Sequence, residues 1–223
     1  MQPLSIHTLA NGVRVLLEPI PASTSAGIIL TIGKGSRDEP EGFGGASHFI
    51  EHLLFKGTEK RDVYELADAL DRLGRGANAY TTNEMVRLHT RVIPNDIETA
   101  LELFADMLWA STFPAAEVDR ERGVILEEIA ECIDIPEDQC FDQFLDAMWS
   151  PHPIGRPILG QPERIRTYSR NMLLEYWERM RQPSQITLSL AGAIEPGRVL
   201  DAAERLFGNC SGTKTTTPQV PKG

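Results

Sequence analysis

The sequence predicts an α+β protein in which helices pack on one face of a mixed, antiparallel-dominated sheet. Short runs rich in β-branched and alternating apolar residues occupy the first 32 residues and recur near residues 77–92 and 185–191. Between these runs lie longer segments in which apolar residues recur at helical spacing. Strands and helices alternate only in part, which is typical of an α+β protein rather than of a regular parallel α/β fold.

The first three strands that we expect lie before residue 33. Residues 5–9 and 13–18 flank Asn11-Gly12, a dipeptide suited to the positive φ angles of a tight turn, so these residues predict a hairpin. The isoleucine-rich run Ala26–Ile32 predicts a third strand. A loop rich in glycine, proline and acidic residues follows over residues 36–45.

From residue 46 onward the pattern is mainly helical. Eight segments carry apolar residues at helical spacing, and a proline opens four of them, at Pro94, Pro114, Pro162 and Pro196. Three strand-like runs lie among these helices, and residues 152–161 form a loop rich in proline and glycine. In chain order the expected elements are helices 46–57 and 63–73, strands 77–82 and 85–92, helices 94–109, 114–133, 137–148, 162–167 and 169–180, strand 185–191, and helix Pro196–Phe207.

The composition fits a domain that builds its own core. The chain has 223 residues, of which 41% are hydrophobic and 24% charged, and this length allows one large domain or two small ones. Such a core does not depend on disulfide bonds. We assign residues 1–210 to one domain. Residues 211–223 are rich in Thr, Pro and Lys with almost nothing to bury, which is typical of the start of an interdomain linker.

The charge and the cysteines restrict the class of partner and the compartment. The net charge of −10 argues against nucleic acid and anionic membranes as partners and mildly favours basic ligands. Cys132, Cys140 and Cys210 leave one thiol unpaired in any disulfide scheme, which indicates free thiols in a reducing compartment. No signal peptide or membrane-spanning run is visible in these residues. We therefore expect a cytoplasmic protein.

The expected helix from residue 46 contains the pattern His-x-x-Glu-His at His48, Glu51 and His52. Residues four apart lie one above the other on a helix, so both imidazoles can reach one metal ion. Glu51 adjoins His52 and can accept a proton from a water whose pKa the metal lowers. Catalytic zinc needs a third protein ligand and an open position.

Another interpretation is that these histidines are core or capping residues. The helix is entered through Gly-Phe-Gly-Gly and holds two of the five histidines in the chain, which favours the metal site. The helix alone does not decide between the two interpretations.

The third ligand is expected on the helix over residues 114–133. Glu121 and Glu128 are seven residues apart and share a face, and apolar neighbours beside that face indicate that both acids point inward. A buried carboxylate needs a cation or donors, and zinc meets that need. Glu127 lies about a hundred degrees round from Glu128 and is expected in solvent. Glu131, one turn further on, remains the second choice.

Several stretches together resemble the pitrilysin (insulinase) family of zinc metallopeptidases, the inverzincins, and especially the N-terminal half of its processing-peptidase branch. They span most of the chain in the order typical of the family. The stretches are Leu-Ala-Asn-Gly-Val-Arg-Val at 9–15, Gly-Ser-Arg-Asp-Glu at 35–39, Gly-Phe-Gly-Gly-Ala-Ser-His-Phe-Ile-Glu-His-Leu-Leu-Phe-Lys-Gly-Thr at 42–58, Asn-Ala-Tyr-Thr at 78–81, Glu-Arg-x-Val-Ile-x-Glu-Glu-Ile at 121–129 and Gly-Arg-Pro-Ile-Leu-Gly at 155–160.

The resemblance implies a zinc endopeptidase that cleaves peptides or unfolded segments with one zinc ion per chain. It implies His48, His52 and Glu128 as zinc ligands, Glu51 as general base and Glu121 as an acid that orients a liganding histidine or the bound water. It also implies that an edge strand accepts the substrate peptide. The residues implied in substrate binding are Asn78, Ala79, Tyr80 and Phe49, for which ordinary strand or core packing is the alternative.

The chain is shorter than the proteins that it resembles. Those proteins consist of two homologous domains that close around the peptide, so the resemblance implies a missing C-terminal domain or a partner subunit, and self-association of this half. A non-catalytic structural or assembly subunit is the rival interpretation, although the complete metal motif favours an enzyme. A closed structural zinc site is a third interpretation.

Overall fold

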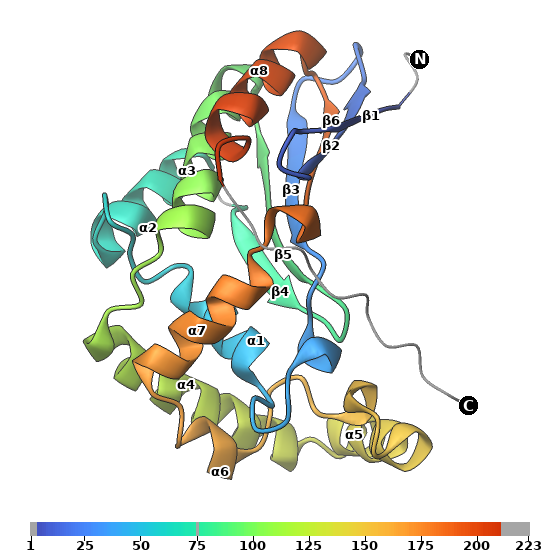
Figure 1. Cartoon of the computed structure of the whole chain (residues 1–223), viewed down its shortest axis with the longest axis vertical. Coiled ribbons are helices and arrows are strands. Elements are labelled where there is room, and N and C mark those ends of the chain that lie inside the picture. Colours follow the sequence, from blue (N-terminus) through green and yellow to red (C-terminus); the bar gives the residue numbers. More distant parts are fainter. Residues whose placement is uncertain (1–3, 75, 211–223) are drawn as a thin grey trace.

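A six-stranded sheet lies beside a set of helices in the computed structural model, which describes residues 4–74 and 76–210 (Figure 1). The strands run across the sheet in the order β1-β2-β6-β3-β5-β4. Strands β2 and β6 pair in parallel, and the other four neighbouring pairs are antiparallel. The strands are β1 Ser5–Thr8, β2 Arg14–Pro19, β3 Ala26–Ile32, β4 Asn78–Thr81, β5 Val86–Val92 and β6 Ile186–Gly192.

The two faces of the sheet differ in burial. In β3, Ala26, Ile28, Leu30 and Ile32 are fully buried, whereas the residues between them are only half-buried. Helices α1 Ala46–Leu53, α3 Ile97–Ala110 and α8 Pro196–Phe207 contact the sheet, and Figure 1 shows α3 and α8 along one side of it. We call this side the covered face and the other the open face. The predicted α+β class, with a mixed sheet and helices on one face, is confirmed.

The other helices lie near their expected positions. None of the described helices is both long and apolar enough to cross a membrane. One expected helix is too long: α1 ends at Leu53 rather than near Gly57, because Leu53 and His52 accept three-residue turn bonds from Lys56 and Phe55. The remaining helices are α2 Val63–Arg72, α4 Ala115–Asp134, α5 Pro136–Trp149, α6 Pro162–Ile165 and α7 Arg170–Met180.

The predicted N-terminal hairpin is present, with a wider connection than a two-residue turn. Thr8 is paired with Arg14, so five residues connect the strands, and Gly12 has a φ of 99°. The Asn11 side chain donates to the carbonyl oxygens of Phe207 and Cys210, at 2.7 and 3.0 Å. Asn11 therefore fastens the hairpin to the end of α8. The expected linker at 211–223 lies outside the described residues.

Helix α5 differs from its neighbours because none of its residues is buried. It lies at the opposite end of the molecule from α8 (Figure 1). Phe141, Phe144 and Met148 are 62%, 56% and 59% exposed, and Ile133 and Ile135, just before the helix, are also exposed. Spacings of three and four residues place the apolar side chains of α5 on one stripe. The helix thus presents an apolar face to solvent.

Candidate metal centre

Helix α1 begins at a glycine that leaves the helix without a cap of its own. Gly45 is the N-cap, with a φ of 87° and no side chain to bond the first N–H groups. A β-carbon there would lie 2.6 Å from the Leu159 carbonyl oxygen, so only glycine fits. The carboxylate of Glu39 fills the role, accepting from the Gly45 and Ser47 backbone N–H groups at 2.9 and 2.7 Å.

Glu39 is a buried carboxyl group in a largely apolar setting. Burial raises its pKa to about 7, although the two backbone donors and Arg156 act in the opposite direction. Tyr176, whose hydroxyl lies 3.2 Å from Ser47 Oγ, and Tyr168, which donates to the Gly44 carbonyl oxygen, complete the polar contacts around this end of the helix. The entry to α1 is therefore fixed by side chains from three other segments.

The predicted metal ligands come together between α1 and α4. His48 and His52 stack one turn apart on α1, with ring centroids 4.6 Å apart. From α4, Glu128 brings Oε2 to 3.7 Å from His48 Nε2 and 3.6 Å from His52 Nε2. One candidate ligand atom from each of the three residues lies within 4.8 Å of the others. Two imidazole nitrogens and one carboxylate oxygen are a donor set that suits zinc.

The surroundings of the histidines fit a bound cation. His52 Nδ1 lies 2.9 Å from Glu121 Oε2, which leaves Nε2 for the cluster. Lys56 Nζ lies 2.8 Å from the other oxygen of Glu121. His48 Nδ1 is buried and has no hydrogen-bond partner among the described residues. Because no hydrogen bond fixes His48 through Nδ1, either ring nitrogen of His48 can face a metal. The residues present therefore fit the ion.

Electrostatics keep these ligands ready to bind. Burial and the neighbouring His52 lower the pKa of His48 to about 4, so its imidazole is neutral near pH 7. Burial alone would raise the pKa of Glu121, but hydrogen bonds from Lys56 and His52 outweigh it and lower that pKa. Glu121 therefore remains an anion that accepts a hydrogen bond from His52.

Glu51 projects from α1 toward the edge of the sheet. Thr81 on β4 donates from Oγ1 to Glu51 Oε2 at 2.5 Å. Burial raises the pKa of Glu51, and the nearby Glu128 carboxylate adds to this effect, while the Thr81 hydrogen bond and His52 oppose it. A carboxyl group with a raised pKa beside a candidate metal site is suited to accept and return a proton.

The expected inward direction of the two acids of α4 holds fully for only one of them. Glu121 is 4% exposed, whereas the Glu128 side chain is 37% exposed and lies at the opening of the site. Ile125 is buried but Val124 is not, because α4 packs along a narrower stripe than expected. Glu127 and Glu131 are both exposed, and the three-residue cluster found in the described chain includes neither.

The residues implied in substrate binding have different positions. β4 lies at one edge of the sheet, as an acceptor of a peptide strand must. Asn78 and Tyr80 point to the open face and are exposed, while Ala79 is buried on the covered face. Phe49 is fully buried, with its ring 6.2 Å from that of Tyr168 and below the guanidinium of Arg122. This position agrees with core packing, the alternative for Phe49, and its part in a substrate pocket stays a prediction.

Three residues of the site were not assigned a role from the sequence. Thr81 ends the Asn-Ala-Tyr-Thr stretch at 78–81. Its hydrogen bond to Glu51 depends on the packing of β4 against α1, which the sequence does not show. Lys56 follows His52 by four residues, a spacing that could have suggested it. The link between Glu39 and α1 depends on the path of the loop after β3, which no local pattern specifies.

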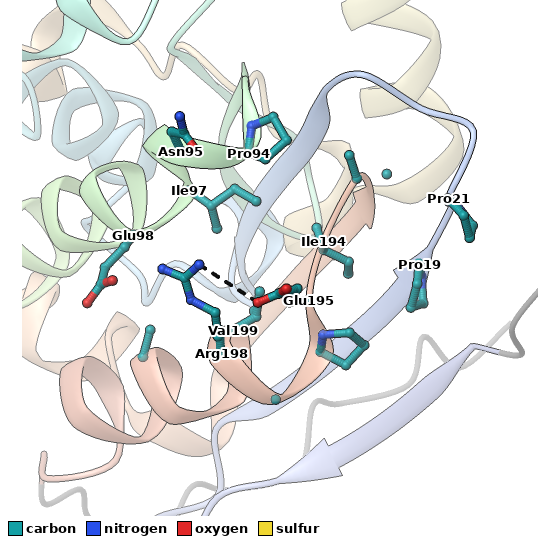
Figure 2. A pocket seen from close by; sticks show the side chains of 15 residues that line it. Pro19, Pro21, Pro94, Asn95, Ile97, Glu98, Ile194, Glu195, Arg198 and Val199 are labelled. Atoms are coloured by element: carbon teal, nitrogen blue, oxygen red, sulfur yellow. Dashed lines mark ion pairs between the residues drawn. The ribbon is translucent and has the colours of Figure 1, made fainter.

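A separate hollow of about 800 Å³ lies at the other end of the sheet. Figure 2 shows it between the start of α8, with Arg198 on the helix and Glu195 just before it, and the start of α3 at Ile97. Glu195 and Arg198 form an exposed ion pair at 3.7 Å. The hollow contains none of the metal-centre residues, so the chemistry is assigned to the site between α1 and α4.

The chain is similar to known proteins over most of its length. A family model described as Insulinase (Peptidase family M16) matches residues 14–162. An uncharacterized zinc protease of Mycobacterium leprae is 36% identical over 218 residues, covering 97% of this chain and 49% of that protein. The uncharacterized zinc protease YmxG of Bacillus subtilis is 36% identical over 203 residues, covering 91% and 49%. The chain thus spans about half the length of these relatives.

Solved structures show the same fold. A protease from Helicobacter pylori superposes with a TM-score of 0.92 at 22% identity, covering 99% of this chain and 53% of that chain. The first half of the periplasmic protease PqqL from Escherichia coli superposes with a TM-score of 0.88 at 24% identity, covering 99% and 49%. At these identities the likeness concerns the fold alone.

Proposed function

Because this chain belongs to the insulinase family of peptidases, peptidase family M16, we propose that it is the metal-binding half of a zinc-dependent endopeptidase. His48, His52 and Glu128 hold the zinc ion, and Glu51 is the general base. The observation that carries the proposal is the meeting of three ligand atoms within 4.8 Å beside a carboxyl group whose pKa is raised. The names of the relatives, which describe zinc proteases, support the choice of metal.

Zinc bound by these residues supplies a Lewis acid that polarises a peptide carbonyl and acidifies a water molecule. The chain's own residues supply the proton transfers and the orientation. Glu51 takes a proton from the attacking water and delivers it to the departing amine, for which a raised pKa is an advantage. Thr81 holds the carboxyl group of Glu51 in place through Oε2.

Glu121 and Lys56 act behind the ligands. By accepting the Nδ1 proton of His52, Glu121 selects the tautomer whose Nε2 faces the cluster. Lys56 balances the charge of Glu121 and keeps it ionised. The pair therefore positions His52 and takes no direct part in bond cleavage.

The substrate class follows from the edge strand. A peptide in extended conformation adds to β4 through main-chain hydrogen bonds, which recognise backbone rather than sequence. Glu51 lies against Thr81 of this strand, so a bound peptide passes close to the base. An extended backbone is available in short peptides and unfolded segments, which we infer to be the substrates.

Glu51→Gln tests the proposal. In a protein that joins this chain to a second half of the relatives' kind, the variant should retain zinc and lose about 10²–10⁴-fold in the turnover of an unstructured peptide. Glu127→Gln, an exposed neighbour on α4, is the control and should change neither quantity. Near-normal turnover of Glu51→Gln would place the base elsewhere. Zinc binding without any turnover of the wild type would favour the assembly-subunit alternative.

A further inference from the structure

The open face of the sheet concentrates positive charge in an acidic chain. Strand pairing places Arg14, Arg87 and Arg91 on this face, where Glu18 is the only acidic strand residue in the part of the sheet that is described. Among the described residues, none of these arginines has a carboxylate within ion-pair distance. The chain as a whole carries a net charge of −10. Unpaired cations on one face of such a chain indicate an anionic partner.

One of these arginines belongs to a compact cluster near the sheet edge. Arg87 Nη1 donates to the Tyr80 hydroxyl at 2.8 Å, and its guanidinium lies 5.9 Å from the centre of the Tyr80 ring. The His89 ring packs against Tyr80 at 5.9 Å. Together with Arg91 and Ile29, these side chains line a hollow of about 330 Å³.

The hydrogen bonding of this cluster is incomplete. Arg87 has five N–H donors, and the bond to Tyr80 is the only hydrogen bond that it makes with other described residues. Arg87 Nε and His89 Nδ1 are shielded from solvent and have no partner in the described chain. The free donors of Arg87 lack an acceptor, and a carboxylate is the acceptor that a guanidinium binds best.

The cluster stands directly across β4 from the metal centre. Thr81 touches Glu51 on the covered face, whereas Tyr80, the preceding residue, faces the open side. A peptide added to the free edge of β4 alternates in the same way. Each residue whose side chain turns toward the metal therefore has neighbours whose side chains turn toward Tyr80.

The Arg87 side chain is long enough to approach a peptide residue that faces the open side. A peptide strand added beside β4 lies two strand spacings, roughly 10 Å, from the β5 backbone. The contact with Tyr80 carries the guanidinium of Arg87 across part of that distance. This reach favours acidic side chains on the open side.

We propose that Tyr80, Arg87 and His89 form a side-chain subsite that selects an acidic residue of the peptide substrate. This inference rests on the proposed binding of a peptide along β4. Arg87 is the specificity-determining residue, Tyr80 holds its guanidinium over the strand, and the alternation of the bound peptide fixes which residues face the subsite. A peptide with an acid at alternate positions can satisfy it in one register while presenting neutral residues to the metal.

A binding assay tests the subsite apart from catalysis. The Glu51→Gln form of the 223-residue chain is titrated into two labelled ten-residue peptides that carry Glu or Gln at alternate positions, and fluorescence anisotropy gives Kd. We expect about tenfold tighter binding of the Glu peptide. Arg87→Gln should reduce this preference to less than twofold, while Arg87→Lys, which retains the charge, should keep part of it.

Arg14→Gln is the matched control, because it removes the same charge from the same face three strands away. It should leave the preference near tenfold, and thermal unfolding should show that every variant is folded. Equal Kd values for the two peptides, an equal loss in Arg14→Gln, or no binding of either peptide at millimolar concentration would overturn the subsite. Failure of the proposed enzyme would instead appear as missing zinc or turnover with the Glu preference intact.

Discussion

At the scale of single residues, His52 makes use of both ring nitrogens. Nδ1 is held by Glu121 at 2.9 Å, and Nε2 lies 3.6 Å from the Glu128 carboxylate. Removing the ring therefore takes away a candidate ligand and also leaves the buried Glu121 with Lys56 as its remaining charged partner. The affinity for zinc should therefore fall by different amounts when His52, Glu121 or Glu128 is substituted.

We expect His52→Ala to abolish stoichiometric zinc binding, whereas Glu121→Gln should keep zinc with an affinity about 10–100-fold lower. The first change deletes a ligand, and the second only weakens its orientation. Equilibrium dialysis with zinc measured by mass spectrometry gives both values. If His52→Ala still bound one zinc ion per chain, His52 would not be a ligand.

Glu128 and Glu131 are the two candidates for the third ligand, and substituting each of them distinguishes between the two. Glu128→Gln should lose tight zinc binding and Glu131→Gln should not, because only the former lies in the cluster. The two substitutions remove the same charge one turn apart on α4, so each is the control for the other. The opposite pattern would make Glu131 the ligand.

Glu39 couples the entry of α1 to pH. Its pKa is about 7 in the folded chain against 4.5 for an ordinary glutamate, so the folded state binds the proton more tightly. Stability from this group is fully present below pH 4.5 and is lost as the pH rises through 7, a change of roughly 3 kcal/mol in the free energy of unfolding. Glu39→Gln should remove this slope.

Chemical denaturation of wild type and Glu39→Gln at several values between pH 4.5 and 7.5 measures the difference. Both proteins share every other titrating group, so only Glu39 separates the two curves. Parallel curves would show that Glu39 does not hold the proton in the folded chain.

Residue identities in the site were largely predictable, because a helix turns residues four apart to one side. The shared side of His48 and His52 follows from that rule, whereas the spacing on α4 left Glu121, Glu128 and Glu131 open and the family resemblance pointed to Glu128. The contacts of Glu51 with Thr81 and of Glu39 with α1 join segments that are separate in the chain. Such contacts depend on tertiary packing, which no local periodicity encodes.

At the scale of elements, α5 is the one long helix without a buried residue in the part of the chain that the structure describes. Its position directly after α4 was predictable from the pattern of residues 137–148, but its lack of burial was not. Periodicity shows that a helix has an apolar stripe without showing what covers that stripe. Within the described chain, Phe141 and Phe144 remain largely exposed.

We expect the isolated chain to associate through this stripe. Phe141→Asp combined with Phe144→Asp should shift the sedimentation coefficient at high micromolar concentration toward that of a monomer. Because both side chains are exposed, the free energy of unfolding should change by only about 0.5 kcal/mol for each substitution. Tyr64→Asp on α2, an aromatic that is 80% exposed, is the control and should leave association unchanged. A wild type that sediments only as a monomer would contradict this prediction.

At the scale of the whole molecule, the chain holds all the proposed metal ligands but spans about half the length of its relatives. Glu128 lies at the opening of the site and is partly exposed. Water therefore has access to the site. Closure around a peptide and additional groups that stabilise the tetrahedral intermediate would have to come from outside this half.

The 223-residue chain alone should accordingly be folded, bind zinc and show little peptidase activity. Adding the second half should raise the turnover of an unstructured peptide. Circular dichroism and a cleavage assay of the chain with and without that half measure the effect. Comparable turnover from the monomeric chain alone would show that the second half is dispensable.

The position of β6 determines when this molecule can finish folding. β2 and β3 are consecutive in the chain but do not pair, because β6, from residues 186–192, lies between them. Until the ribosome has released that strand, a nascent chain holds two separate pieces of sheet with unpaired edges. Closing the long loop between β2 and β6 is slow, so the hairpin of β1 and β2 keeps an unpaired edge until β6 has been synthesised. Synthesis that stalls before residue 186 would therefore leave an aggregation-prone intermediate with its metal helix already made and its sheet still divided.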